Sequence, residues 1–250
     1  MKVRFGIGLG PLGPGDDLAA IVDRLEELRL DSLWFSEQVA APVVDPVVGQ
    51  AFAVARTTRL RVGSGVGVLP GRHPVLVAKQ LASLAALAPG RVLPVFGLQP
   101  ARAPERAWFP VPEGRRGDVV DESLALVRRL LTEERVTHRG EFFTLDDAAV
   151  ATIRQAAAEA GREVDPEHFG LSLPVAAGEP DERLLRSIAG RRPGLDPRSL
   201  VPSGWAEARR VLAAHVDAGL SKFVVRPASP PASWPRWIDE FAAELTPLQT

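Results

Sequence analysis

The stretch that most restricts the fold of this chain is an extended segment with glycine at every second position, followed at once by an apolar helix. Side chains of a strand point alternately to its two faces, so residues 60–68 place glycines on one face and larger side chains on the other. Strand glycines mark a close approach of a ligand or of another backbone. Two interpretations follow: a flat ring lies against bare backbone, or a barrel strand leaves room for its neighbours. The glycine face consists of Gly63, Gly65 and Gly67, and the other face consists of Leu60, Val62, Ser64, Val66 and Val68.

A short turn connects this strand to a helix that we expect from about Val75 to Ala88. Pro74 suits the first turn of a helix, where a backbone N–H is not needed, and it holds His73 in an extended conformation. Apolar side chains cover much of the helix surface, which is typical of a buried helix. A strand that leads into a buried helix is half of a βαβ unit.

Strands and helices alternate along the rest of the chain, which predicts one α/β domain over residues 1–250 with a parallel sheet, closed or open. A length of 250 residues suits one large domain of this class. Besides the elements above, we expect strands at residues 3–9, 32–35, 91–96, 169–176 and 222–226, a hairpin at 136–145, and helices at 16–30, 46–55, 118–133, 151–160, 182–189, 204–218 and 237–245.

The composition excludes several classes of chemistry. The sequence has no cysteine and no tyrosine, so thiol nucleophiles, thiolate metal sites and phenol acid–base catalysis are excluded. A net charge of -1 provides no general surface for nucleic acid, and the 4 histidines lack metal-ligand spacing. The N-terminal apolar run is too short for a signal peptide, and no stretch is long and apolar enough for a membrane span. We therefore expect a cytoplasmic protein that acts on a small molecule without a metal.

A G-x-G-x-x-G motif at residues 8–13 permits an alternative, a nicotinamide-binding site of the Rossmann type. Glu37 then lies near the end of the next strand, where a ribose-binding acid belongs. Pro11 and Pro14, however, remove N–H groups that a diphosphate needs. The acidic start of the following helix also repels phosphate. These features argue against the alternative.

Polar side chains near strand ends are the candidates for acid–base chemistry. Glu37 and Gln38 follow the second strand, and in a (β/α) barrel the carboxyl ends of the strands form the active-site mouth. Glu37 is either a general base or hydrogen-bonding residue, or a solvated or arginine-paired loop carboxylate. His73 is either a catalytic imidazole or a turn residue fixed by the proline that follows it.

The loop of residues 100–117 is rich in arginine and also leaves two interpretations open. Its arginines bind a phosphate or a carboxylate-rich ligand, or they are solvated, with Arg116 paired to Asp118 or Glu122. The arginines concerned are Arg102, Arg106, Arg115 and Arg116.

Several segments together resemble the bacterial luciferase-like oxidoreductases, which depend on flavin or deazaflavin. The resemblance covers most of the chain and is most specific in RHPVLVAKQLASLAALAPGR at residues 72–91 and in AGLSKFVVRP at residues 218–227. Members of this family are TIM barrels, so the resemblance implies a (β/α)8 barrel. The other matching segments are VRFGIGLG, SLWFSEQ, LRVGSGVGVLPG, GRRGDVVDESLALVRRLL, HRGEFF and SGWAEARRVLAAHVD.

The resemblance also implies an oxidoreductase site, a cofactor and a homodimer. Family members commonly carry a non-prolyl cis peptide against the central ring of the flavin, which we expect at or beside Gly65–Val66. The expected cofactor is coenzyme F420, because the composition fits high-GC actinobacterial members, with FMN as second choice. The implied residues are Ser64, Gly65, Val66, Gly97 and Gln99 for the cofactor, and Glu37, Gln38 and His73 for catalysis.

Three departures from the family pattern matter. Gln38 stands where deazaflavin enzymes often have histidine, and residues 97–100 lack their glutamate, so the usual acid–base pair is not evident. Residues 146–150 run directly into the helix expected at 151–160, which leaves at most about six strands where barrel closure needs eight. We therefore expect a segment around strands 5 and 6, near residues 147–152, to be missing from this sequence. The alternative is a non-catalytic flavin-binding protein with an abridged barrel.

Overall fold

The chain forms two compact units, each assembled from separate stretches of sequence. The computed structural model describes residues 3–10, 16–98, 100, 103–150, 170–191, 196–218 and 220–249. The first unit comprises residues 1–34, 56–60 and 165–250, and the second unit comprises residues 35–55 and 61–164. The assignment of residues 1–250 to one domain stays a prediction. Within the described ranges, no helix has the length and apolar character needed to cross a membrane.

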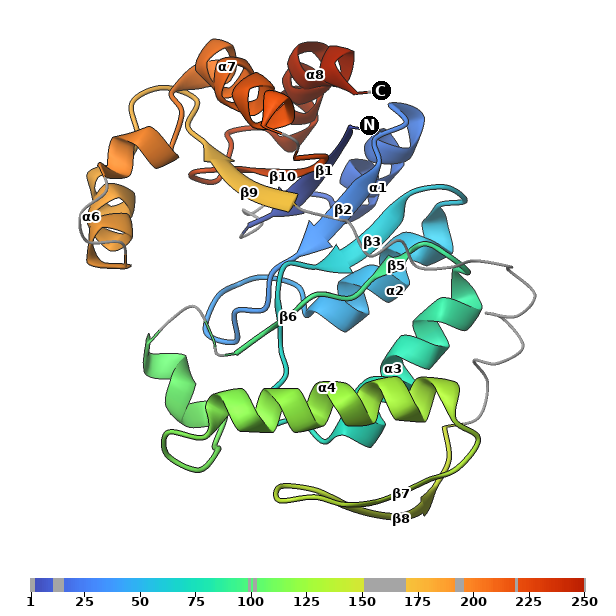
Figure 1. Ribbon diagram of the computed structural model, residues 1–250. Helices are drawn as coiled ribbons and strands as arrows, with labels where there is room; N and C mark the ends of the chain where they lie inside the picture. Colours follow the sequence, from blue (N-terminus) through green and yellow to red (C-terminus); the bar gives the residue numbers. More distant parts are fainter. Residues whose placement is uncertain are drawn as a thin grey trace. The chain divides into compact units, whose positions relative to one another are not determined.

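The first unit is built on parallel strands (Figure 1). Strand β1 (Arg4–Leu9) pairs in parallel with β10 (Lys222–Pro227), and β10 pairs in parallel with β9 (Gly170–Val175). Strand β2 (Ser32–Phe35) lies on the other side of β1, and its last residue belongs to the second unit. The register sets Phe5 opposite Phe223, and their buried rings stack 5.6 Å apart in the core of this unit.

One helix of the first unit packs against two others (Figure 1). Helix α8 (Trp234–Leu245) contacts both α1 (Leu18–Glu27) and α7 (Gly204–Asp217). The buried Trp237 lies at the centre of this packing, 5.2 Å from the ring of Trp205 and 5.7 Å from that of Phe241. Helix α6 (Glu182–Arg191) and short 3₁₀ turns at Pro197–Leu200 and Thr246–Leu248 complete the described part of this unit.

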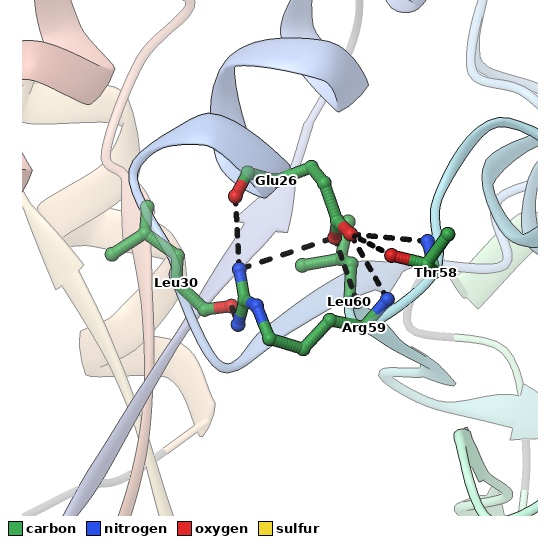
Figure 2. Close-up of polar contacts among 5 residues, drawn as sticks. All are labelled: Glu26, Leu30, Thr58, Arg59 and Leu60. Atoms are coloured by element: carbon green, nitrogen blue, oxygen red, sulfur yellow. Dashed lines mark hydrogen bonds and ion pairs between the residues drawn. The ribbon is translucent and has the colours of Figure 1, made fainter.

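One carboxylate of α1 holds residues 58–60 in place, as Figure 2 shows. Glu26 Oε1 accepts hydrogen bonds from the backbone N–H of Thr58 and of Arg59, each at 3.0 Å, and from the Thr58 hydroxyl at 2.9 Å. Its Oε2 accepts from the N–H of Leu60 at 2.8 Å. Burial raises the pKa of Glu26, but these hydrogen bonds outweigh burial and hold the pKa below its ordinary value. The carboxylate therefore stabilises this loop in its ionised form.

The second unit contains short parallel pairs where the sequence predicts two continuous strands. Strand β3 (Arg61–Ser64) pairs with β5 (Val92–Leu93), and β4 (Gly67–Val68) pairs with β6 (Phe96–Gly97). The predicted strands at 60–68 and 91–96 are therefore each divided in two. Residues 65 and 66 lie between β3 and β4 along the chain and belong to neither strand. Val66 is 38% exposed, although the alternation predicts that it shares a face with buried residues.

Helices α2 (Pro46–Arg56), α3 (Pro74–Leu87) and α4 (Arg116–Thr132) form the rest of the second unit with a hairpin of β7 (Val136–Arg139) and β8 (Thr144–Ala148). A 3₁₀ turn covers Ala103–Trp108. Helices α3 and α4 pack together (Figure 1). One buried cluster joins α3, α4 and the hairpin, and it consists of Ala78, Leu126, Leu130, Val136 and Leu145.

Apart from the two divided strands and the 3₁₀ turns, the described elements agree with the predicted ones in type and order, with ends that differ by a few residues. Asp17 caps α1, because its carboxylate accepts from the N–H of Ala19 at 2.8 Å. The helix expected at 151–160 lies outside the described residues. The missing segment predicted near 147–152 also reaches into that part of the chain, so it stays a prediction.

Candidate functional site

A small pocket lies in the second unit where β3 and β4 meet. Its volume is about 40 Å³, which is room for roughly two or three water molecules or for the edge of a larger ligand. Valine, leucine and phenylalanine side chains of α3 and β6 form an apolar wall. The polar residues that line it are Glu37, Asp45, Gln50, Ser64, Arg72 and Gln80.

Glu37 contributes a buried carboxylate whose two oxygens both accept hydrogen bonds from the protein. The residue is 9% exposed and follows β2. Oε2 accepts from the N–H of Val68 at 2.5 Å, and Oε1 accepts from the guanidinium of Arg72. Glu37 is thus paired with an arginine in a buried rather than a solvated position, and its catalytic role stays a prediction. The ion pair connects the end of β2 with β4 and with the turn before α3.

Gln50 and Ser64 form a second polar contact in the pocket. Gln50 is 2% exposed, and its Nε2 donates to the carbonyl oxygen of Pro46 and to the hydroxyl oxygen of Ser64, each at 3.0 Å. Ser64 is the last residue of β3 and is 8% exposed. Helix α2 thereby fixes a hydroxyl group at the end of a central strand.

The peptide bond between Gly65 and Val66 is cis, as expected from the resemblance. Two hydrogen bonds hold Gly65: its N–H donates to the Phe35 carbonyl at 2.7 Å, and its carbonyl accepts from the Ser36 hydroxyl at 3.2 Å. Val66 lies over Gly97, because a Cβ atom on Gly97 would be only 2.6 Å from Val66 Cγ2. The absence of a side chain at residue 97 therefore makes room for Val66.

Two exposed apolar side chains lie near the cis peptide and near Gly97 in sequence. They are Val66, 38% exposed, and Leu98, 54% exposed, which directly follows Gly97, and neither lines the pocket. Aromatic ring systems bind against apolar side chains with a few polar groups at their edges. The residues present therefore fit one face of a flavin or deazaflavin ring.

His73 and Gln38 are not among the residues that line the described pocket. His73 is the N-cap of α3, where its Nδ1 accepts from the N–H of Val75 at 3.4 Å. Its ring meets the edge of Phe143 at a centroid distance of 5.9 Å, so its geometry is that of a turn residue. Gln38 is half-buried, and its carbonyl accepts from the N–H of Ala41. The catalytic roles of His73 and Gln38 stay predictions, and Gln99 lies outside the described residues.

The predicted pairing of Arg116 with Asp118 or Glu122 is wrong. Arg116 donates instead to the carbonyl oxygens of Arg106 and Phe109. Arg115 is the residue that pairs with Asp118. It also donates to both carboxylate oxygens of Glu141, at 2.6 and 2.7 Å. Glu122 accepts from His138 and from backbone N–H groups of the hairpin. These contacts bring in partners from residues 138–143, which local spacing does not reveal, and Arg102 lies outside the described residues.

Sequence reasoning missed Gln50 and gave Arg72 no role. A signal for Gln50 exists, because it is the only uncharged polar side chain of α2, four residues after Pro46 in an otherwise mostly apolar helix. An isolated polar residue on an apolar helix face is a sign of a buried hydrogen bond. Arg72 offers no such signal, because its partner is 35 residues away along the chain.

Comparisons with known proteins identify the family of this chain. The sequence model described as "Luciferase-like monooxygenase" matches residues 2–151. Limonene 1,2-monooxygenase of Rhodococcus erythropolis is 32% identical over 162 residues, which are 59% of this chain and 41% of that protein. An F420-dependent glucose-6-phosphate dehydrogenase of Kineococcus radiotolerans is 31% identical over 158 residues, 60% of this chain and 47% of its own length. This chain thus spans less than half the length of both relatives.

Solved structures show the fold. Monooxygenase RslO1 from Streptomyces bottropensis has a TM-score of 0.74 at 20% identity, with 98% of this chain and 99% of that chain covered. An F420-dependent secondary alcohol dehydrogenase has a TM-score of 0.73 at 19% identity, with 100% of both chains covered. The α/β fold with a parallel sheet therefore matches luciferase-like barrels, and the Rossmann alternative finds no support in these comparisons.

Proposed function

Since the chain belongs to the luciferase-like monooxygenase family, we propose that it is an oxidoreductase that uses coenzyme F420 or reduced FMN. The reaction is either hydride transfer to or from a small organic substrate, or monooxygenation of such a substrate. The observation that carries the proposal is that the exposed Val66 lies over Gly97, two residues after the buried Ser64. An uncovered apolar surface with a hydrogen-bonding group at its edge suits the face of a tricyclic ring.

The protein's own residues bind and orient the ring in this proposal. Val66 and Leu98 exclude water from one face of the ring, and Ser64 lies at its edge. We call Val66 and Leu98 the ring platform. Glu37, which is paired with Arg72, accepts from the N–H of Val68, two residues after Val66, and so keeps the ring platform rigid. The cofactor supplies the redox chemistry when it is bound.

Coenzyme F420 is our first choice of cofactor. A glucose-6-phosphate dehydrogenase from Intrasporangium calvum, named as F420-dependent, is 33% identical over 202 residues, or 76% of this chain and 55% of its own length. FMN remains the second choice, because a matching Baeyer–Villiger monooxygenase structure contains FMN, at a TM-score of 0.67.

A second candidate function is flavin binding without catalysis. The observation that favours it is that the predicted acid–base groups are engaged within the protein. Both oxygens of Glu37 accept protein hydrogen bonds, and His73 caps α3. Under this alternative, the chain binds the ring tightly and shows no turnover.

The homodimer expected from the resemblance also remains a proposal. Exposed apolar side chains on two helices of the second unit support it: Val48 and Phe52, four residues apart on α2, and Leu76 and Leu87 on α3. Light scattering of the purified protein tests it. We expect twice the chain mass of 26.8 kDa, and we expect substitution of Val48 and Phe52 by serine to give monomers.

A ligand titration followed by turnover assays separates the two functions. The purified protein is titrated with F420, FMN and NADPH, and binding is followed by cofactor fluorescence. We expect saturable binding of F420 or FMN, and weak or no binding of NADPH. Turnover with a reductant and a panel of small alcohols, aldehydes and ketones then favours the oxidoreductase. Tight binding without turnover across the panel favours the non-catalytic alternative.

A further inference from the structure

The hydrogen bonds of Gln50 determine which way its amide group points. Its Nε2 is 3.0 Å from both the Pro46 carbonyl oxygen and the Ser64 hydroxyl oxygen. If the amide were turned around, its oxygen would face the carbonyl of Pro46, and two acceptors cannot share a hydrogen bond. The Pro46 carbonyl therefore fixes the amide with its NH₂ group toward Ser64.

This orientation assigns the direction of the Ser64 hydroxyl. Each hydrogen of the NH₂ group has one partner, and the Ser64 oxygen is the acceptor of one of them. The Ser64 hydrogen must then point to a different acceptor. No described residue accepts it, although Ser64 is only 8% exposed. Ser64 lines the pocket and directly precedes Gly65, which does not line it.

We propose that Ser64 donates its hydroxyl hydrogen to a carbonyl oxygen or ring nitrogen of the bound ring, and that Gln50 is the positioning residue that sets this direction. The proposal rests on the proposed function, because it takes the ring to lie at residues 64–66. The small volume of the pocket fits it, since about 40 Å³ accommodates an oxygen substituent at the edge of a ring but not the whole ring. A donor at this edge stabilises the reduced ring, which carries more negative charge on its heteroatoms.

Substitutions at Ser64 and Gln50 test the proposal through ring binding and midpoint potential. Ser64→Ala removes the donor, and Ser64→Thr keeps it. Gln50→Met removes the amide and keeps most of its volume. Ser83→Ala is the matched control, because Ser83 is an exposed serine of α3 outside the pocket, and its hydroxyl donates to the Lys79 carbonyl of its own helix. Thermal melting of each variant confirms that it is folded, and Ser64→Cys replaces Ser64→Ala if the alanine variant is not.

We expect Ser64→Ala to weaken FMN or F420 binding about two- to tenfold, the value of one hydrogen bond, and to lower the midpoint potential of the bound ring. Gln50→Met has a smaller effect, and adding it to Ser64→Ala changes binding no further, because the amide acts only through the hydroxyl. Ser64→Thr keeps most of the parent affinity because it keeps the donor, and Ser83→Ala binds like the parent protein.

Two results would overturn the inference and leave the proposed function intact: a Ser64→Ala protein with the affinity and potential of the parent, or an undiminished Gln50→Met effect in the Ser64→Ala background. If the parent protein binds neither FMN nor F420, the proposed function fails and the inference fails with it. The parent titration thus distinguishes the two failures.

Discussion

The position of Val66 in the ring platform depends on residue 97 being a glycine. We expect Gly97→Ala to displace Val66, because the new Cβ would lie 2.6 Å from Val66 Cγ2. Overpacking of this kind costs about 1–3 kcal/mol and should also weaken ring binding. Urea unfolding and an FMN titration measure the two effects. Gly117→Ala is the control, because a Cβ there meets nothing within 4 Å. Equal ring affinity for the two variants would refute the placement of the ring on Val66.

Arg72 provides a second prediction at this scale. Arg72→Met leaves the Glu37 carboxylate buried without its partner, and we expect a loss of about 3 kcal/mol in the free energy of unfolding. Arg135→Met breaks an ion pair to Asp147 in which both side chains are more than 60% exposed, at 64% and 63%, and should have little effect on stability. Chemical denaturation of both variants gives the comparison. Similar losses in both would show that the Glu37 pair contributes no more than a surface contact.

Individual residues were predictable where the signal is local. The extended conformation of His73 before Pro74 follows from adjacent residues, and the structure has it at φ -76° and ψ 125°. The position of Glu37 at a strand end was likewise predictable. Its partner was not, because Arg72 reaches Glu37 only once β2 and the turn before α3 are brought together.

At the scale of elements, the carboxylate of Glu26 joins α1 to residues 58–60. Glu26→Gln replaces one acceptor oxygen by an NH₂ group, which cannot accept from the backbone N–H groups that it meets. We expect a loss of about 1–3 kcal/mol at pH 7, measured by urea unfolding. Glu27→Gln in the same helix is the control, because Glu27 forms only an exposed pair with Arg24 and its loss should have little effect.

The pH dependence of this loss follows from the lowered pKa of Glu26. A carboxyl group with a depressed folded-state pKa stabilises the protein above its unfolded-state value, here 4.5, and loses that contribution as the pH falls through the folded-state pKa. The difference between the parent and Glu26→Gln should therefore be constant at neutral pH and shrink below pH 4.5. A difference that grows on acidification would contradict this account.

Element types were largely predictable from sequence because periodicity, proline and capping residues are local signals. The division of the strand at 60–68 was not predictable from alternation, which treats Val66 like Val62 and Val68. Hydrogen bonds from Gly65 to Phe35 and from Ser36 to Gly65 hold this part out of the ladder, and both join separate stretches of sequence. Only the resemblance to the luciferase-like family indicated a special conformation there.

At the scale of the whole molecule, the family and the fold rest on matches over most of the chain, and the activity remains a proposal. The candidate site as described here lies within the second unit, so its geometry is independent of how the two units are arranged. The sequence predicts that the segment 64–66 and Glu37 belong to the site, and these roles stay predictions. The supporting contacts of Gln50 and Arg72 required the three-dimensional structure, because each joins a helix or turn to a distant strand end.

The measurement that most directly tests the central claim is a titration of the purified protein with coenzyme F420 and with FMN, with Gly97→Ala titrated in parallel. The account predicts saturable binding of at least one of the two by the parent protein, and weaker binding of the same cofactor by Gly97→Ala. Absence of binding of both cofactors, with the parent protein folded by its thermal melt, would contradict the assignment of this chain as a flavin- or deazaflavin-dependent oxidoreductase.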